Sequence, residues 1–138
     1  MKFKHRLSAL LLALSLTLSL GLIPAGAVSE STALEAIQAL GIMAGDENGN
    51  LNLTSPVTRA EFVTMMTAAS VYKDTVGTGT GVSLFKDVKS DHWASQYVKL
   101  AVEQGWMSGY VDGTFRPDSQ ITLEEACTAL LKLLGYQS

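Results

Sequence analysis

Cysteine and histidine are scarce in this 138-residue sequence. The single cysteine, Cys127, excludes a disulfide within the chain. Of the two histidines, only His92 lies beyond the N-terminal leader, which argues against a Cys–His nucleophilic pair and against a histidine-based metal site. Cys127 falls in an apolar helical pattern, and this predicts a buried structural thiol rather than a nucleophile.

Long hydrophobic runs are absent except at the N-terminus. Three basic residues precede the apolar run 7–23, and Ala25-Gly26-Ala27 fits a small-x-small cleavage site. We therefore expect a signal peptide over residues 1–27, with an uncleaved anchor as the less favoured alternative. No later stretch is apolar enough to cross a bilayer, so no membrane segment is expected after cleavage. An exported chain without disulfides is more typical of a bacterial protein than of a small eukaryotic one.

Positive charge is scarce beyond the leader. Residues 1–27 carry three of the ten Lys and Arg, so their removal leaves seven basic against thirteen acidic residues, a net charge of −6. An acidic exported domain argues against nucleic acid and against attraction to anionic lipid by bulk charge. The roughly 111 remaining residues suffice for one small core. Any anionic partner must therefore be held by a local site.

What the sequence does contain is a tandem repeat. Residues 41–62 align without gaps with residues 105–126, at an offset of 64, and seven of the 22 pairs are identical. Average residue usage gives roughly one or two identities. Each segment starts with a glycine that follows a helical pattern and ends in a Thr-x-x-Glu helix start. The function should therefore be interpreted from the repeated unit.

The repeated unit consists of a helix, a glycine-bounded loop and a capped helix. Capping boxes are expected at Thr32, Thr58 and Thr122, each with a glutamate three residues later. The apolar spacing predicts helices over 32–40, 58–72, about 90–104 (capped by Ser90 or Asp91) and 122–134. The expected fold class is all-α, with tandem helix-loop-helix repeats packed as a small bundle after the signal peptide.

The expected domain organisation follows from composition. After the signal peptide, residues 28–72 form a partial repeat and residues 84–138 a full one. Residues 73–83 are rich in Gly and Thr and are expected to be a flexible linker.

Several motifs connect this repeat to a known family. The second repeat contains Phe85-x-Asp-Val, His92-Trp-Ala and Ser108-Gly-Tyr-x-Asp-Gly-Thr-Phe-Arg-Pro, and the first contains Val57-Thr-Arg-Ala-Glu-Phe. In these motifs, and over about residues 32–136, the chain resembles the S-layer homology (SLH) domain family of bacterial cell-surface proteins. The resemblance implies a non-catalytic module, secreted to the cell wall, that binds secondary cell-wall polysaccharide with pyruvylated sugar. It implies binding grooves at helix N-termini and neither a cofactor nor a metal.

The resemblance also selects candidate glycan-binding residues. Arg59 is the expected partner of a sugar carboxylate, because a guanidinium pairs bidentately with carboxylates and a helix start favours anions. This hypothesis requires Arg59 to be open to water and not closed into an internal ion pair. In the second box Leu123 stands in the arginine position, which puts a second site in doubt. The other candidates are Thr58, Glu61, Trp93, Gly109, Asp112, Thr122 and Glu125.

Structural interpretations of these residues stay open. Capping alone explains the threonine and glutamate pairs, core packing explains Trp93, and a positive φ explains Gly109. The run from Asp46 to Asn52 alternates oxygen-bearing side chains, but its glycine and its twelfth residue do not fit a calcium loop. A polar turn is therefore expected there.

Two other functional classes compete with wall binding. The alternative is an SLH-like structural or protein-interaction scaffold that has lost glycan binding, as Leu123 suggests for one repeat. An enzyme acting on wall glycan is disfavoured, since the acidic residues lie mostly at caps and turns rather than paired across a cleft. Family members usually present three repeats, whereas this chain has fewer than two. We therefore expect self-association or partnership with other SLH proteins in addition to cell-wall polysaccharide.

Overall fold

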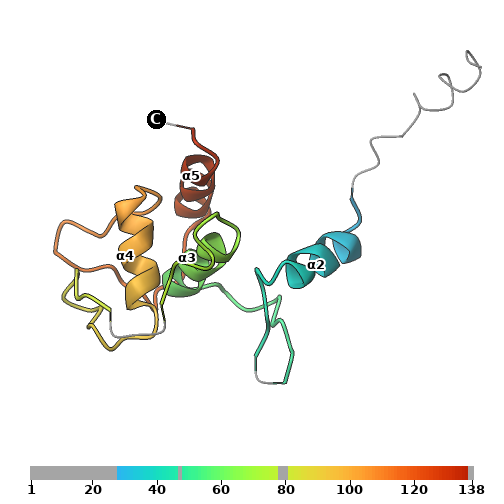
Figure 1. Cartoon of the computed structure of the whole chain (residues 1–138), viewed down its shortest axis with the longest axis horizontal. Coiled ribbons are helices and arrows are strands. Elements are labelled where there is room, and N and C mark those ends of the chain that lie inside the picture. The colour runs from blue at the N-terminus through green and yellow to red at the C-terminus, as the bar shows by residue number, and fades with distance from the viewer. Residues whose placement is uncertain (1–27, 47, 78–80, 137–138) are drawn as a thin grey trace, which may run out of the picture. The chain divides into compact units, whose positions relative to one another are not determined.

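The computed structural model describes residues 28–46, 48–77 and 81–136. Within these ranges the regular structure is helical: α2 (Glu30–Ala39), α3 (Arg59–Ala68), α4 (Ser95–Glu103) and α5 (Leu123–Leu133), as Figure 1 shows. The same ranges contain no strand, only two isolated bridges. The all-α prediction is thus confirmed, whereas the signal peptide lies outside the described residues.

The chain divides between Ala33 and Leu34 into two compact units, and all that follows concerns the second unit except the first turn of α2. Across the described ranges, no helix combines the length and the hydrophobicity that a membrane crossing needs.

Helix α2 begins earlier than the sequence predicts. Ser29 Oγ accepts the backbone N–H of Thr32 at 3.2 Å, so this serine takes the capping position and Thr32 lies inside the helix. The predicted capping box at Thr32 is therefore wrong. Gly41, with φ +71°, ends this segment in the left-handed conformation that the sequence predicts.

The other two capping boxes form as predicted. Thr58 Oγ1 accepts the N–H of Glu61 at 3.2 Å, and Glu61 Oε2 accepts the N–H of Thr58 at 2.8 Å. Thr122 and Glu125 make the same pair of bonds at the start of α5, at 3.2 and 3.0 Å. Each box satisfies backbone groups that the helix itself leaves unpaired.

Helices α3 and α4 are both shorter than predicted. Helix α3 ends at Ala68 and is followed by turns, so it does not reach Tyr72. Helix α4 starts after Ala94 without a side-chain cap, and the predicted cap at Ser90 or Asp91 is wrong because residues 90–94 form turns.

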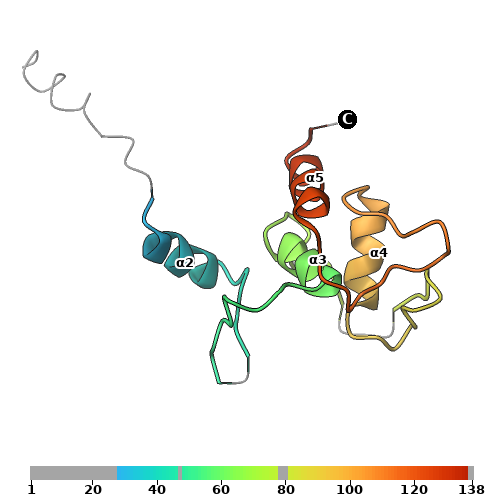
Figure 2. The same cartoon turned by 180° about the vertical axis from the view of Figure 1, so that it is seen from behind.

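The core is centred on α3. Figures 1 and 2 show α4 and α5 lying against it, and Phe115, from the loop between those two helices, is fully buried in the same cluster. From helix α5, Ala129 is buried in this core and Leu133 packs against it while remaining partly exposed. The predicted burial of Cys127 is wrong: its side chain is exposed, because nothing in the described chain covers that side of α5.

The starts of α3 and α5 lie side by side. The N–H of Arg59 donates to the carbonyl of Ser119 at 2.9 Å, and the N–H of Ile121 donates to the carbonyl of Val57 at 3.0 Å. These bonds form the antiparallel bridge just before the two helices. Two boxes that are 64 residues apart in sequence are thereby brought together.

Candidate functional site

The side chain of Arg59, the first residue of α3, points into the protein and is 2% exposed. Nη1 donates to Glu125 Oε1 at 2.6 Å, Nε donates to the carbonyl of Phe115 at 2.8 Å, and Nη2 donates to the carbonyl of Ser108 at 3.0 Å. The guanidinium carbon also lies 4.9 Å from the ring centroid of Tyr110 and 4.6 Å from that of Phe115. Every nitrogen of the guanidinium thus has a partner in the second repeat.

The prediction that Arg59 is open to water is therefore wrong. A buried guanidinium is stable only when its charge and donors are matched, and here α5 supplies one carboxylate and the second loop supplies two carbonyls. A ligand-binding role for Arg59 required a side chain open to water and free of an internal ion pair, and neither holds. We assign Arg59 a structural role instead, because it joins the first capped helix to the second repeat.

Glu125 is the acceptor at the centre of this contact. Its Oε2 caps α5, while its Oε1 accepts both Arg59 and the hydroxyl of Tyr110 at 2.8 Å. Burial raises the pKa of Glu125, but hydrogen bonds from Thr122 and Tyr110 and the charge of Arg59 outweigh burial, so the net pKa is lowered. The bond to Glu125 in turn raises the pKa of Tyr110. The carboxylate is thus held in its charged form.

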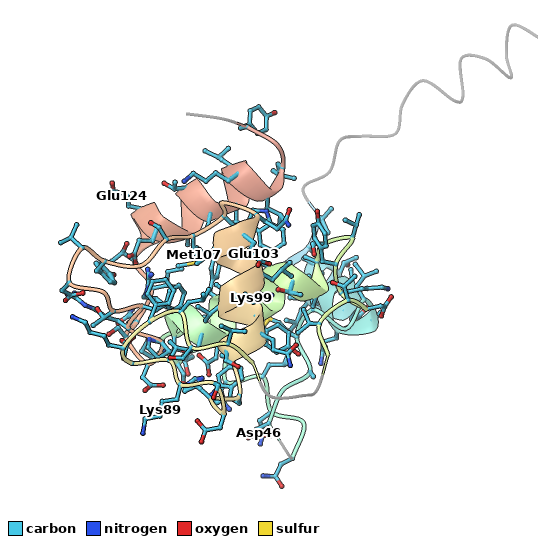
Figure 3. All side chains as sticks on the ribbon, turned by 60° about the vertical axis from the view of Figure 1, so that its left-hand side comes forward. Asp46, Lys89, Lys99, Glu103, Met107 and Glu124 are labelled. Carbon is cyan, nitrogen blue, oxygen red and sulfur yellow. The ribbon has the colours of Figure 1, made fainter. Side chains whose placement is uncertain are left out.

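A groove of about 160 Å³ opens beside this contact. We call it the second-repeat groove; it is lined by Arg59, Trp106, Met107, Ser108, Glu124, Glu125, Thr128 and Lys132. Two of these residues, Met107 and Glu124, are labelled in Figure 3. Predicted candidates Arg59 and Glu125 meet here, and Thr58 and Thr122 hold the helix starts nearby.

Lys132 lines this groove but was not among the binding residues predicted from the sequence. This lysine lies on α5 two turns after Glu125, and no ion pair is recorded for it among the described residues. Since Arg59 is already neutralised, Lys132 is the cation that this groove has available for an anion. The spacing of Glu125, Thr128 and Lys132 along one helix face was a signal for it.

Trp93 and Glu61 belong to a different groove. This opening of about 440 Å³, the first-repeat groove, lies between the loop 41–57 and α3. Trp93 is 57% exposed and its ring stacks on His92 at a centroid distance of 5.8 Å, so the interpretation of Trp93 as a core residue is wrong. Figure 3 shows Asp46, from this groove, below Glu124 in the view, and the two grooves share no lining residue. The structure therefore does not bring Arg59 and Trp93 into one site.

Gly109 and Asp112 have structural partners of their own. A Cβ added to Gly109 would lie 2.1 Å from a ring carbon of Phe85, so close approach of that ring, and not the predicted positive φ, requires glycine there. Asp112 accepts bonds from the hydroxyl and N–H of Thr114 and from Arg116, and these bonds lower its pKa to about 2. Both residues shape the loop rather than either groove.

The run from Asp46 to Asn52 forms the polar turn that the sequence predicts. Asp46 Oδ1 accepts the N–H groups of Asn48 and Asn50, both at 2.9 Å, and the bond from Asn50 is the main reason that the pKa of Asp46 is lowered. Within the described ranges, no group of three or more His, Cys, Asp or Glu residues could hold a metal ion.

Comparison with known proteins gives a consistent set of relatives. The S-layer homology domain matches residues 25–63 and 84–127. The Middle cell wall protein of Brevibacillus brevis is 32% identical over 104 residues, which make up 75% of this chain and 10% of that protein. The Surface layer protein of Brevibacillus choshinensis is 31% identical over 104 residues, or 75% of this chain and 9% of that protein. The Cellulosome-anchoring protein of Acetivibrio thermocellus is 40% identical over 79 residues, or 56% of this chain and 17% of that protein.

Proposed function

Because the chain belongs to the S-layer homology domain family, we propose that it is a non-catalytic module that anchors a protein to the cell wall by binding wall polysaccharide. The chain covers about a tenth of the length of its first relatives, so this proposal concerns the module and not a whole protein. Its location is the bacterial cell surface, as in those relatives.

The second-repeat groove is the proposed sugar site, and Lys132 carries the proposal. Its ammonium group can pair with a carboxylate such as that of a pyruvylated sugar, while Thr128 and the carbonyl edge at Ser108 can hydrogen-bond sugar hydroxyls. Glu124 lines the same groove and opposes an anion, so the ligand must present its carboxylate toward Lys132. Arg59 and Glu125 line the groove and position its two walls, and their ion pair leaves Lys132 as the cation available to the sugar.

A single groove of this size predicts weak binding. One charged contact of this kind contributes about 1.5 to 3 kcal/mol. Wall polysaccharide repeats its sugars, and several modules on one surface would raise the avidity without any new contact. Anchoring in this proposal therefore comes from many weak contacts.

Wall retention measured against pyruvyl content tests the proposal. We expect the chain to sediment with native cell wall and to lose about tenfold in affinity on wall stripped of pyruvyl groups, or after Lys132→Gln. Lys89→Gln is the matched control, because Lys89 makes the same charge change and lines neither groove (Figure 3). Equal retention of the Lys132 and Lys89 variants would remove Lys132 from the site. Failure of the unmodified chain to bind either wall would favour the scaffold alternative.

A further inference from the structure

The two grooves lie at equivalent positions in the two repeats. At the offset of 64, six residues that line the second-repeat groove correspond to six that line the first-repeat groove. The loops above them also match: Asn52 and Arg116 both have positive φ, 49° and 58°. The first-repeat groove nevertheless has the larger volume, about 440 Å³ against about 160 Å³ for the second-repeat groove. We therefore asked which part of the second-repeat groove has no counterpart in the first.

The missing part is the start of an arginine-bearing helix. In the second-repeat groove, α3 inserts Arg59, whose guanidinium bonds Ser108, Phe115 and Glu125. The backbone beside it adds three further bonds, from the N–H groups of Arg59 and Ala60 and to the carbonyl of Val57. Among the described residues, no arginine-bearing helix start occupies that position in the first-repeat groove, because α2 has no arginine and Arg59 bonds to the second repeat.

The first-repeat groove nevertheless retains the acceptors for such an arginine. The equivalents of its three partners are the carbonyls of Ala44 and Leu51 and Oε1 of Glu61, and all three residues line the groove. Among the described residues, hydrogen bonds to Glu61 are recorded only at Oε2, and none is recorded to either carbonyl.

The backbone edge of this groove is open in the same way. The carbonyls of Leu53 and Ser55 and the N–H of Val57 correspond to Pro117, Ser119 and Ile121, which bond to α3 in the second repeat. No hydrogen bond is recorded for these three groups within the described ranges. Six groups that hold a helix start in one repeat are thus present in the other, where the described part of the chain offers them no hydrogen-bond partner.

We propose that the first-repeat groove binds the capped start of a helix from a different protein chain, one that carries arginine at its first helical position. Glu61 supplies the complementary charge, and Ala68 stands where the second-repeat groove has Lys132, so this groove lacks a cation that would repel the incoming guanidinium. A second copy of this chain is a poor donor. Its Arg59 is already paired internally, and its other box presents Leu123, which is 82% exposed and has no donor group. The sequence allowed either self-association or another SLH protein as partner, and these contacts favour the second.

A donor and acceptor pair built from this chain tests the proposal directly. The donor is a double variant that carries both Leu123→Arg and Glu61→Gln. The acceptor is the unmodified chain, and a bacterial expression host secretes both proteins. Leu123 is a surface residue and glutamine keeps the capping box, so both variants should fold, which circular dichroism checks. We expect sedimentation to show a one-to-one complex in the mixture and single chains when each is alone.

Two controls make the result specific. Glu61→Gln in the acceptor should weaken the complex about tenfold or more, and Leu123→Lys in the donor should also weaken it, because lysine lacks the planar fork. A folded donor that forms no complex would overturn the proposal, as would a complex that Glu61→Gln leaves unchanged. Self-association of the unmodified chain under the same conditions would also overturn it, since the partner would then not need an arginine. None of these readouts involves wall polysaccharide, so they are separate from the test of anchoring.

Discussion

At the scale of single residues, Arg59 is a cation whose partners all lie in the other repeat. Its guanidinium is buried, and it is paired with Glu125 and two backbone carbonyls rather than with solvent. Burial of a charge is costly unless such partners are present, and breaking a matched pair leaves one member without compensation. The residue that sequence analysis selected for binding is therefore better understood as the connection between repeats.

Replacing Arg59 should therefore destabilise the fold. We expect Arg59→Ala to lower the free energy of unfolding in urea by about 3 to 5 kcal/mol, because the carboxylate of Glu125 and two carbonyls lose their donor. Arg116→Ala is the control, since the Arg116–Asp112 pair is about half exposed and should contribute less than about 1 kcal/mol. A similar small loss for both variants would contradict the structural role of Arg59.

Glu125 predicts how stability depends on pH. Its pKa in the folded protein is lowered below the ordinary value of 4.5, so the stability it contributes is fully present above that value and is lost as the pH falls through the folded pKa. Urea unfolding across the acidic range should therefore show a decline below pH 4.5 that is shallower in Glu125→Gln. Parallel pH profiles for the two proteins would show that the carboxylate does not titrate as expected.

At the scale of elements, helix α5 is well capped at its N-terminus, but most of its apolar side chains are exposed. Its capping box is complete, but Ala129 is its only buried residue, and Leu130, Leu131 and Leu134 remain exposed. The apolar pattern of α5 indicates which face favours burial, whereas the described chain provides cover for only a small part of it.

Substitutions on α5 should follow this burial pattern. We expect Ala129→Leu to cost about 1 to 3 kcal/mol, because a larger side chain overfills the core. Leu134→Ser should change the free energy of unfolding by less than about 0.5 kcal/mol, since that leucine already meets solvent. Thermal or urea unfolding measures both, and a large loss for Leu134→Ser would mean that the leucine face is covered in solution.

At the scale of the whole molecule, the repeated unit gives two grooves that differ in the cations that line them. Lys132 in one corresponds to Ala68 in the other, and Arg59 lines the second-repeat groove whereas none of the described residues that line the first-repeat groove is an arginine. These differences are the basis for proposing two functions, glycan binding in the second-repeat groove and partner binding in the first.

The two functions should be separable by mutation. We expect Lys132→Gln to lower wall retention without changing the donor–acceptor complex, and Glu61→Gln to weaken the complex without changing wall retention. Groups without shared partners usually act additively, so the double variant should show both losses and no more. If either substitution lowers both binding activities by similar factors, the grooves do not have the separate roles assigned to them.

The sequence by itself determined the parts of this protein that depend on neighbours three or four residues away. The boxes at Thr58 and Thr122 and the left-handed Gly41 were predictable, because capping bonds and helix ends use groups that are close along the chain. The repeat and the family were also visible in the sequence.

Only the tertiary structure decided what those parts do. Arg59 and Glu125 are 66 residues apart, and no local pattern shows that a loop carbonyl and a distant carboxylate will enclose a guanidinium. The exposure of Cys127 was not predictable either, because periodicity shows which helix face is apolar but not whether another segment covers it. The close contact between the Phe85 ring and Gly109 also depends on tertiary packing, because the two residues are far apart in sequence. Burial depends on long-range packing, and here it closes Arg59 off from solvent, which is why the proposal for sugar binding uses Lys132.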